Sequence, residues 1–120
     1  MMNVPPPRPL RITHPVLGLL LAVAVLSPPA QAADAEVELT IRGHQFTPAE
    51  IRVPAGQRVK LLVHNQDAAP EEFESYSLNR EKIVPAGAKV AIFIGPLKAG
   101  RYEFFGDFNP ATARGVVVAQ

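Results

Sequence analysis

The sequence predicts an all-β protein, a Greek-key antiparallel β-sandwich preceded by a cleavable signal peptide. Three observations support this fold class. Apolar residues alternate with polar ones in several short segments, which is the period of a strand with one buried face. Glycine and proline turn signals separate these segments at intervals of about eight to twelve residues. Beyond residue 33, no stretch repeats apolar residues at the helical spacing over three turns.

The first 32 residues are expected to be a signal peptide and to lie outside the fold. Arg8 and Arg11 precede an apolar run over residues 16–26, and Ala30, Gln31 and Ala32 form a small-residue cleavage pattern. The alternative is an uncleaved membrane anchor, but the run is shorter than the roughly 20 apolar residues that span a bilayer. We therefore expect an exported, periplasmic protein with one domain over residues 33–120.

The composition of that domain excludes several classes of protein. Without Arg8 and Arg11 it has ten basic and eleven acidic residues, so it offers no basic block for nucleic acid or anionic lipid. The chain has no cysteine, so its stability comes from the core and not from disulfides. Both methionines, Met1 and Met2, lie in the leader. A thiolate or thioether metal ligand is therefore absent from the domain.

The first half of the domain is expected to form three strands. Val37, Leu39 and Ile41 alternate with polar residues in the first strand, and a bend with Pro48 follows it. A short second strand covers residues 51–53. The turn at residues 54–56 combines a proline that presets φ with a glycine that can adopt a positive φ. The more apolar segment 59–63 is the third strand.

The second half supplies the remaining strands. A polar loop over residues 65–70 leads into a weaker strand over 71–78, followed by a short strand at 83–84. Residues 85–87 repeat the proline-alanine-glycine turn. Strands are then expected at 90–94, 101–105 and 116–118. The total of about seven or eight short strands is typical of a sandwich.

Several motifs across the domain are shared with a known family. They are Phe46-x-Pro48-x-x-Ile51-x-Val53-Pro-Ala-Gly56-x-x-Val59, Asn65-x-Asp67, Gly100-x-Tyr102-x-Phe104 and Gly115-x-Val117. Together they resemble a cupredoxin. The segments 71–75, 80–82 and 104–108 resemble, more narrowly, the small periplasmic cupredoxin-like proteins that accompany bacterial iron permeases. This resemblance implies a membrane iron permease and its associated periplasmic proteins as partners, with membrane contact only through them.

The resemblance also shows which metal ligands the chain lacks. Blue-copper members carry a histidine after a proline that corresponds to Pro70, where this chain has Glu71. In the last loop, Gly106 takes the cysteine position, Asn109 the histidine position, and Ala113 or Thr112 the methionine position. A type-1 copper centre, which requires the thiolate, is therefore excluded.

Other residues at the same end of the sandwich offer a different metal site. His44 follows the first strand, Glu72 and Glu74 share one face of their strand, and Asp107 lies in the last loop. One imidazole with two or three carboxylates suits ferrous or cupric ion better than cuprous ion. We therefore predict a metal site made from His44, Glu72 and Glu74 or Asp107, with iron or copper as the ion.

Each of these residues also has an ordinary structural interpretation. His44 is suited to a turn, charged glutamates protect edge strands from unwanted pairing, and Asp107 beside Gly106 is a common turn former. His64, at the end of an apolar strand, is a weaker candidate ligand. Phe105 and Phe108 could form a docking patch around the site.

No arrangement of nucleophile, base and acid is present, so we do not expect an enzyme. The sequence instead predicts a metal-binding accessory protein for iron uptake. A metal-free sandwich that acts only as a docking subunit is the alternative from another class. Electron transfer is a third interpretation, and the missing copper ligands count against it.

Overall fold

The computed structural model describes residues 2–15, 18, 22–29 and 33–120, and the chain divides into two units, residues 1–30 and 31–120. No described residue of the first unit lies in a helix or strand. The expected cleavage pattern at residues 30–32 and much of the apolar run, residues 16–17 and 19–21, lie outside the described residues. Within the described part of the chain, no helix is long and apolar enough to cross a membrane.

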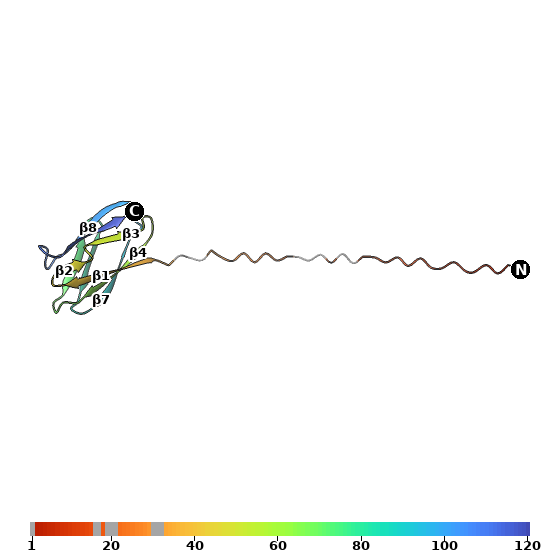
Figure 1. Ribbon diagram of the computed structural model, residues 1–120, viewed down its shortest axis with the longest axis horizontal. Coiled ribbons are helices and arrows are strands. Elements are labelled where there is room, and N and C mark those ends of the chain that lie inside the picture. Colours follow the sequence, from red (N-terminus) through yellow and green to blue (C-terminus); the bar gives the residue numbers. More distant parts are fainter. Residues whose placement is uncertain (1, 16–17, 19–21, 30–32) are drawn as a thin grey trace. The chain divides into compact units, whose positions relative to one another are not determined.

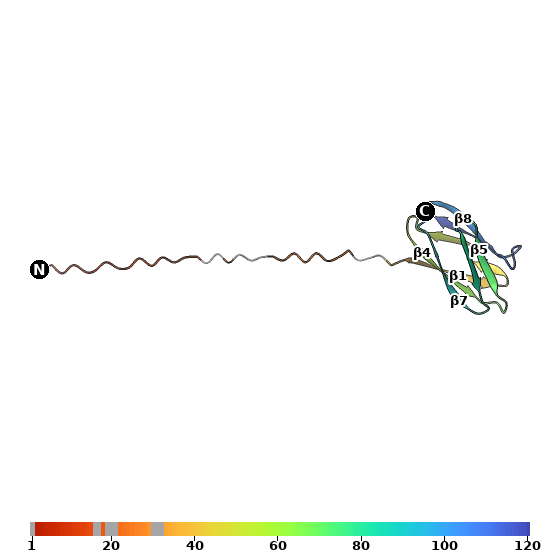
Figure 2. The ribbon, with the colours of Figure 1, turned by 180° about the vertical axis from the view of Figure 1, so that it is seen from behind.

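The second unit consists of two β-sheets (Figure 1). Its nine strands, among the residues described, are β1 (Ala35–Arg42), β2 (Gln45–Thr47), β3 (Glu50–Val53), β4 (Val59–Asn65), β5 (Glu71–Ser75), β6 (Arg80–Val84), β7 (Lys89–Ile94), β8 (Gly100–Gly106) and β9 (Arg114–Ala119). One sheet has the order β2-β1-β4-β7 and the other the order β3-β9-β8-β5-β6. The view from behind shows β5 beside β8 (Figure 2). The predicted all-β fold is confirmed.

The prediction of purely antiparallel pairing is wrong for two strand pairs. β1 pairs in parallel with β4, and β3 pairs in parallel with β9. The chain leaves the first sheet after β2, adds β3 to the other sheet, and returns to the first as β4. Parallel strands cannot be joined by a hairpin, and this passage through the other sheet is the crossover that allows β4 to run beside β1 in the same direction.

Several strand boundaries differ from those expected. Residues 45–47, predicted as part of a bend, form the short strand β2. β5 ends at Ser75, because Tyr76 begins a turn in which the Asn79 amide donates to the Tyr76 carbonyl over 3.1 Å. β6 is correspondingly longer than predicted. The two repeated turns are confirmed, with φ of 72° at Gly56 and 70° at Gly87.

The core joins the two sheets through three aromatic side chains. Phe46 on β2 meets Phe104 on β8 edge to face at a centroid distance of 5.0 Å, and Phe104 stacks on Phe73 at 5.1 Å. All three rings are at most 4% exposed. Such aromatic pairs add to the free energy gained by burying their area. Gly115 is required beside them, because a Cβ there would lie 2.2 Å from the Phe104 ring.

A buried asparagine shapes the loop that leads into β5. Asn65 is fully buried, and its side-chain Nδ2 donates to the carbonyls of Ala69 and Val84 over 2.9 and 3.1 Å. Its Oδ1 accepts a hydrogen bond from the Asp67 amide at 3.0 Å. These bonds satisfy every polar atom of the side chain and fix the chain just before Glu71.

Candidate metal centre

The strand β5 presents a different chemistry on each of its faces. Phe73 and Ser75 are buried toward the core, and Glu71 shares their parity and is 1% exposed. Glu72 and Glu74 alternate with them and therefore project from the outer face of the sheet. The neighbouring strand β8 ends at Gly106, and the Asp107 amide donates to the Glu72 carbonyl over 2.9 Å. This bond brings the last loop alongside the outer face of β5.

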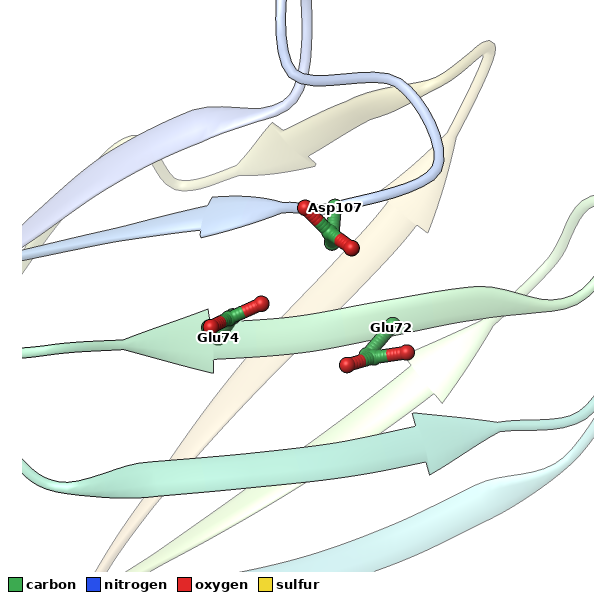
Figure 3. Close-up of side chains that lie close together, drawn as sticks. All are labelled: Glu72, Glu74 and Asp107. Atoms are coloured by element: carbon green, nitrogen blue, oxygen red, sulfur yellow. The ribbon is translucent and has the colours of Figure 1, made fainter.

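Three carboxylates converge on that outer face (Figure 3). Glu72, Glu74 and Asp107 each offer a carboxylate oxygen, and these three oxygens all lie within 4.8 Å of one another. Glu72 is 9% exposed, Glu74 is half-buried and Asp107 is exposed. We call these three residues the carboxylate cluster. Oxygen atoms at this spacing suit a hard or borderline cation.

The concentration of negative charge changes the protonation of the cluster. A hydrogen bond shared with the carboxyl group of Glu81, desolvation, and repulsion from Glu81, Asp107 and Glu74 together raise the pKa of Glu72 to about 7. Glu81 is the cross-strand partner of Glu74 on β6. Desolvation and repulsion from Asp107 and Glu81 also raise the pKa of Glu74. A bound cation would relieve this repulsion and displace the proton.

His44 lies outside the carboxylate cluster. It occupies the turn between β1 and β2 with a φ of 56°, and its Nδ1 is 3.6 Å from Asp67 Oδ2. The amides of Gly43 and His44 donate to the Asp67 carboxylate over 2.7 and 2.9 Å, and these bonds lower the pKa of Asp67. The predicted residues Glu72, Glu74 and Asp107 are therefore brought together, whereas the fourth, His44, contacts Asp67 in a turn. His64, the weaker candidate, has its Nδ1 3.5 Å from the Gln66 side chain.

Glu71 fills the interior of the same end of the sandwich. One carboxylate oxygen accepts hydrogen bonds from the amides of Phe108 and Glu72 at 2.9 and 3.0 Å. The other accepts a bond from Asn109 Nδ2 at 2.8 Å. A Cβ on Gly106 would lie 2.6 Å from Glu71 Cδ and 2.7 Å from Ala113 Cβ. The positions that the resemblance aligns with copper ligands lie close together, and the carboxylate of one of them, Glu71, occupies the space beside Gly106, Asn109 and Ala113.

Two of the residues that shape this region were missed in the sequence. Glu81 approaches Glu72 and Glu74 only through the pairing of β5 with β6, and no spacing along the chain reports that register. Asp67 belongs to the polar loop over residues 65–70 and to the Asn65-x-Asp67 motif, and neither pattern predicts a contact with His44. The preference of aspartate for accepting backbone amides in turns is the signal that could have indicated its role beside His44.

Comparison with known proteins identifies the family. The Cupredoxin-like domain family matches residues 15–119 of the chain. The chain belongs to this family. The uncharacterized protein RP394 of Rickettsia prowazekii (strain Madrid E) is 46% identical over 83 residues, which cover 69% of this chain and 66% of that protein. The cupredoxin-like chain thus spans slightly less than two thirds of the length of this relative.

Solved structures share the cupredoxin-like fold at low sequence identity. Auracyanin A, a blue copper protein from Chloroflexus aurantiacus, superposes with a TM-score of 0.64 and 15% identity, over 73% of this chain and all of that chain. The metal-binding domain of the Cu(I)-exporting P-type ATPase CopA from Streptococcus pneumoniae D39 also reaches 0.64 at 15% identity, over 71% and 84% of the two chains. A purple cupredoxin from Nitrosopumilus maritimus gives 0.55 at 20% identity, over 72% and 100%. The absence of cysteine from this chain is consistent with the lack of a type-1 copper centre.

Proposed function

We propose that this cupredoxin-like protein is an exported metal-binding accessory protein that holds iron or copper for a membrane iron permease. The observation that carries the proposal is the approach of Glu72, Glu74 and Asp107 to within 4.8 Å. The metal is cargo, held at the outer face of the sandwich and released to a partner. The export and the permease rest on the leader and on the resemblance of segments 71–75, 80–82 and 104–108 to periplasmic proteins of iron uptake.

The donor set limits the choice of ion. Carboxylate oxygens are hard ligands, whereas cuprous ion selects thiolates and thioethers, which this domain lacks. An all-carboxylate site therefore suits Fe(II) and Cu(II) better than Cu(I). Because Asp107 is exposed and lies beyond the end of β8, the ion would be accessible to a partner protein without unfolding of a strand.

A titration of the metal-free protein with Fe(II) under anaerobic conditions, and separately with Cu(II), tests this function. We expect a single site of roughly micromolar affinity that Asp107→Asn weakens by about tenfold or more. His44→Ala is the matched control, because His44 contacts Asp67 and not the carboxylate cluster. Failure of the wild-type protein to bind either ion would instead favour the metal-free docking subunit. Equal binding by wild type and Asp107→Asn would show that the ion lies elsewhere.

A further inference from the structure

A groove lies on the outer face of the five-stranded sheet, next to the carboxylate cluster. Its volume is about 650 Å³, and its lining includes Tyr76, Arg101, Glu103, Phe105, Pro110 and Arg114. Small-molecule sites in proteins commonly have volumes of about 300–1,000 Å³ and combine apolar walls with a few charged groups. The groove therefore has the size and composition of a ligand site.

Strand register arranges three chemically different side chains in one row. Glu74 on β5 pairs with Phe105 on β8, and Phe105 pairs with Arg114 on β9. Residues paired in register on adjacent strands project from the same face of a sheet. A carboxylate, an aromatic ring and a guanidinium therefore follow one another across three strands, with the ring in the middle.

The groove exposes aromatic surface from two neighbouring side chains. The rings of Tyr76 and Phe105 lie 5.5 Å apart between centroids at an angle of 60°. Tyr76 is 79% exposed and lies in the turn that follows β5. Because the two rings are tilted relative to each other, a planar ligand can contact both of them at once.

The charges in the groove favour an anion at one end. Arg114 is exposed and forms no ion pair with any residue that the structure describes. Arg101 is already 3.4 Å from Glu50 Oε1. Glu103 lies on the same face as Arg101 and would repel an anion placed between Arg101 and Phe105. Glu74 pairs with Phe105 from the β5 side and would repel an anion there, whereas Arg114 pairs with Phe105 from the β9 side. An anion is therefore expected to bind at the end of the groove formed by Phe105, Pro110 and Arg114.

We propose that this groove binds a small aromatic carboxylate. The carboxylate pairs with the planar guanidinium of Arg114, whose fork matches two carboxylate oxygens, and the ring lies against Phe105 and Tyr76. This proposal goes beyond the metal-binding function and does not depend on it, since none of the groove residues belongs to the carboxylate cluster.

Titration of the ¹⁵N-labelled, metal-free protein with benzoate, followed by amide chemical shifts, tests the proposal. We expect saturable shifts at Phe105 and Arg114 with roughly millimolar affinity. Acetate, which has the same charge and no ring, should bind at least about tenfold more weakly. Because the protein is metal-free, failure of the metal-binding function would leave this result unchanged.

Two variants and a control make the test specific. Arg114→Gln should weaken benzoate binding by about tenfold or more, because a charged hydrogen-bond pair is lost. Tyr76→Ala should weaken it without affecting the fold, because this side chain is largely exposed. Arg58→Gln removes the same charge at the residue that precedes β4, where Arg58 pairs with Asp34, and should leave benzoate binding unchanged.

Three results would overturn the proposal. They are the absence of saturable shifts, equal effects of Arg114→Gln and Arg58→Gln, and equal binding of acetate and benzoate. An acidic peptide that shifts the same amides when benzoate does not would identify a protein partner as the occupant, and this too would overturn it.

Discussion

The carboxylate of Glu71 accepts a hydrogen bond from the side chain of Asn109 over 2.8 Å. Cupredoxin resemblance aligns these two positions with metal-binding histidines of blue-copper proteins. Here they contact each other directly, and the same carboxylate also accepts the Phe108 amide. The interior position of a metal is thus taken by a hydrogen-bonded carboxylate. Because side chains alternate along β5, the next residue, Glu72, projects outward, where the carboxylate cluster forms.

Removal of this carboxylate should destabilise the fold. Glu71→Ala leaves the Phe108 amide and the Asn109 side chain without their acceptor at a site that is 1% exposed. We expect the free energy of unfolding to fall by about 2–4 kcal/mol, which urea denaturation measures.

Glu38→Ala is the control for that substitution. Glu38 is an exposed glutamate on β1, so its loss should change the free energy of unfolding by no more than about 0.5 kcal/mol. Similar effects of the two substitutions would contradict a structural role for Glu71.

Gly106 should not tolerate even a methyl group. The added Cβ of Gly106→Ala would lie 2.6 Å from Glu71 Cδ, so the buried carboxylate or the last loop must shift. Overpacking of this kind costs about 1–3 kcal/mol. Gly100→Ala, at the start of the same strand, meets nothing closer than 3.7 Å and serves as the control in the same urea experiment. Equal stabilities for the two variants would show that Glu71 moves aside freely.

The sequence was sufficient to predict the fold class and much of the strand content. Alternation identified β1 and β3, and the two proline-alanine-glycine turns were placed correctly, because these signals are local. Parallel pairing of β1 with β4 was not predicted, since it depends on the path of the chain between two sheets. Strand β2 was interpreted as a bend for a related reason: its three residues are too short to show a period.

The carboxylate cluster was predictable only in part. The parity of Glu72 and Glu74 placed both on one face, and the last loop was expected nearby. The contribution of Glu81 could not be predicted, because it depends on which strand pairs with β5 and in which register. The prediction grouped His44 with the cluster because both were expected near one end of the fold. In the structure, the Asp67 carboxylate accepts hydrogen bonds from the amides of Gly43 and His44, and the His44 ring lies beside Asp67 and not beside the cluster.

Protonation of Glu72 should make stability depend on pH. The pKa of Glu72 is raised from its usual value of 4.5 to about 7 in the folded protein. Between pH 4.5 and about 7, the folded state therefore binds more protons than the unfolded state. Stability from this group is therefore fully present below about pH 4.5 and is lost as pH rises through about 7. Thermal denaturation of the metal-free protein should show Tm falling over this interval.

The variant Glu72→Gln isolates that effect. The amide cannot ionise, so the fall in Tm between about pH 4.5 and 7 should become smaller, and the variant should be more stable than wild type at pH 8. Glu38→Gln is the control, since Glu38 is exposed and lies on the other sheet. A steeper or unchanged fall in Glu72→Gln would contradict the raised pKa.

Metal binding at the carboxylate cluster should appear as a change in thermal stability. An ion that binds only the folded state at 100 times its Kd adds about 2.7 kcal/mol to the free energy of unfolding. For a domain of this size, that corresponds to a rise in Tm of about 10 °C or more. Asp107→Asn should lose most of this rise, whereas His44→Ala should retain it, because the His44 ring faces Asp67. Loss of the rise in His44→Ala but not in Asp107→Asn would place the ion at the turn between β1 and β2, away from the outer face of β5.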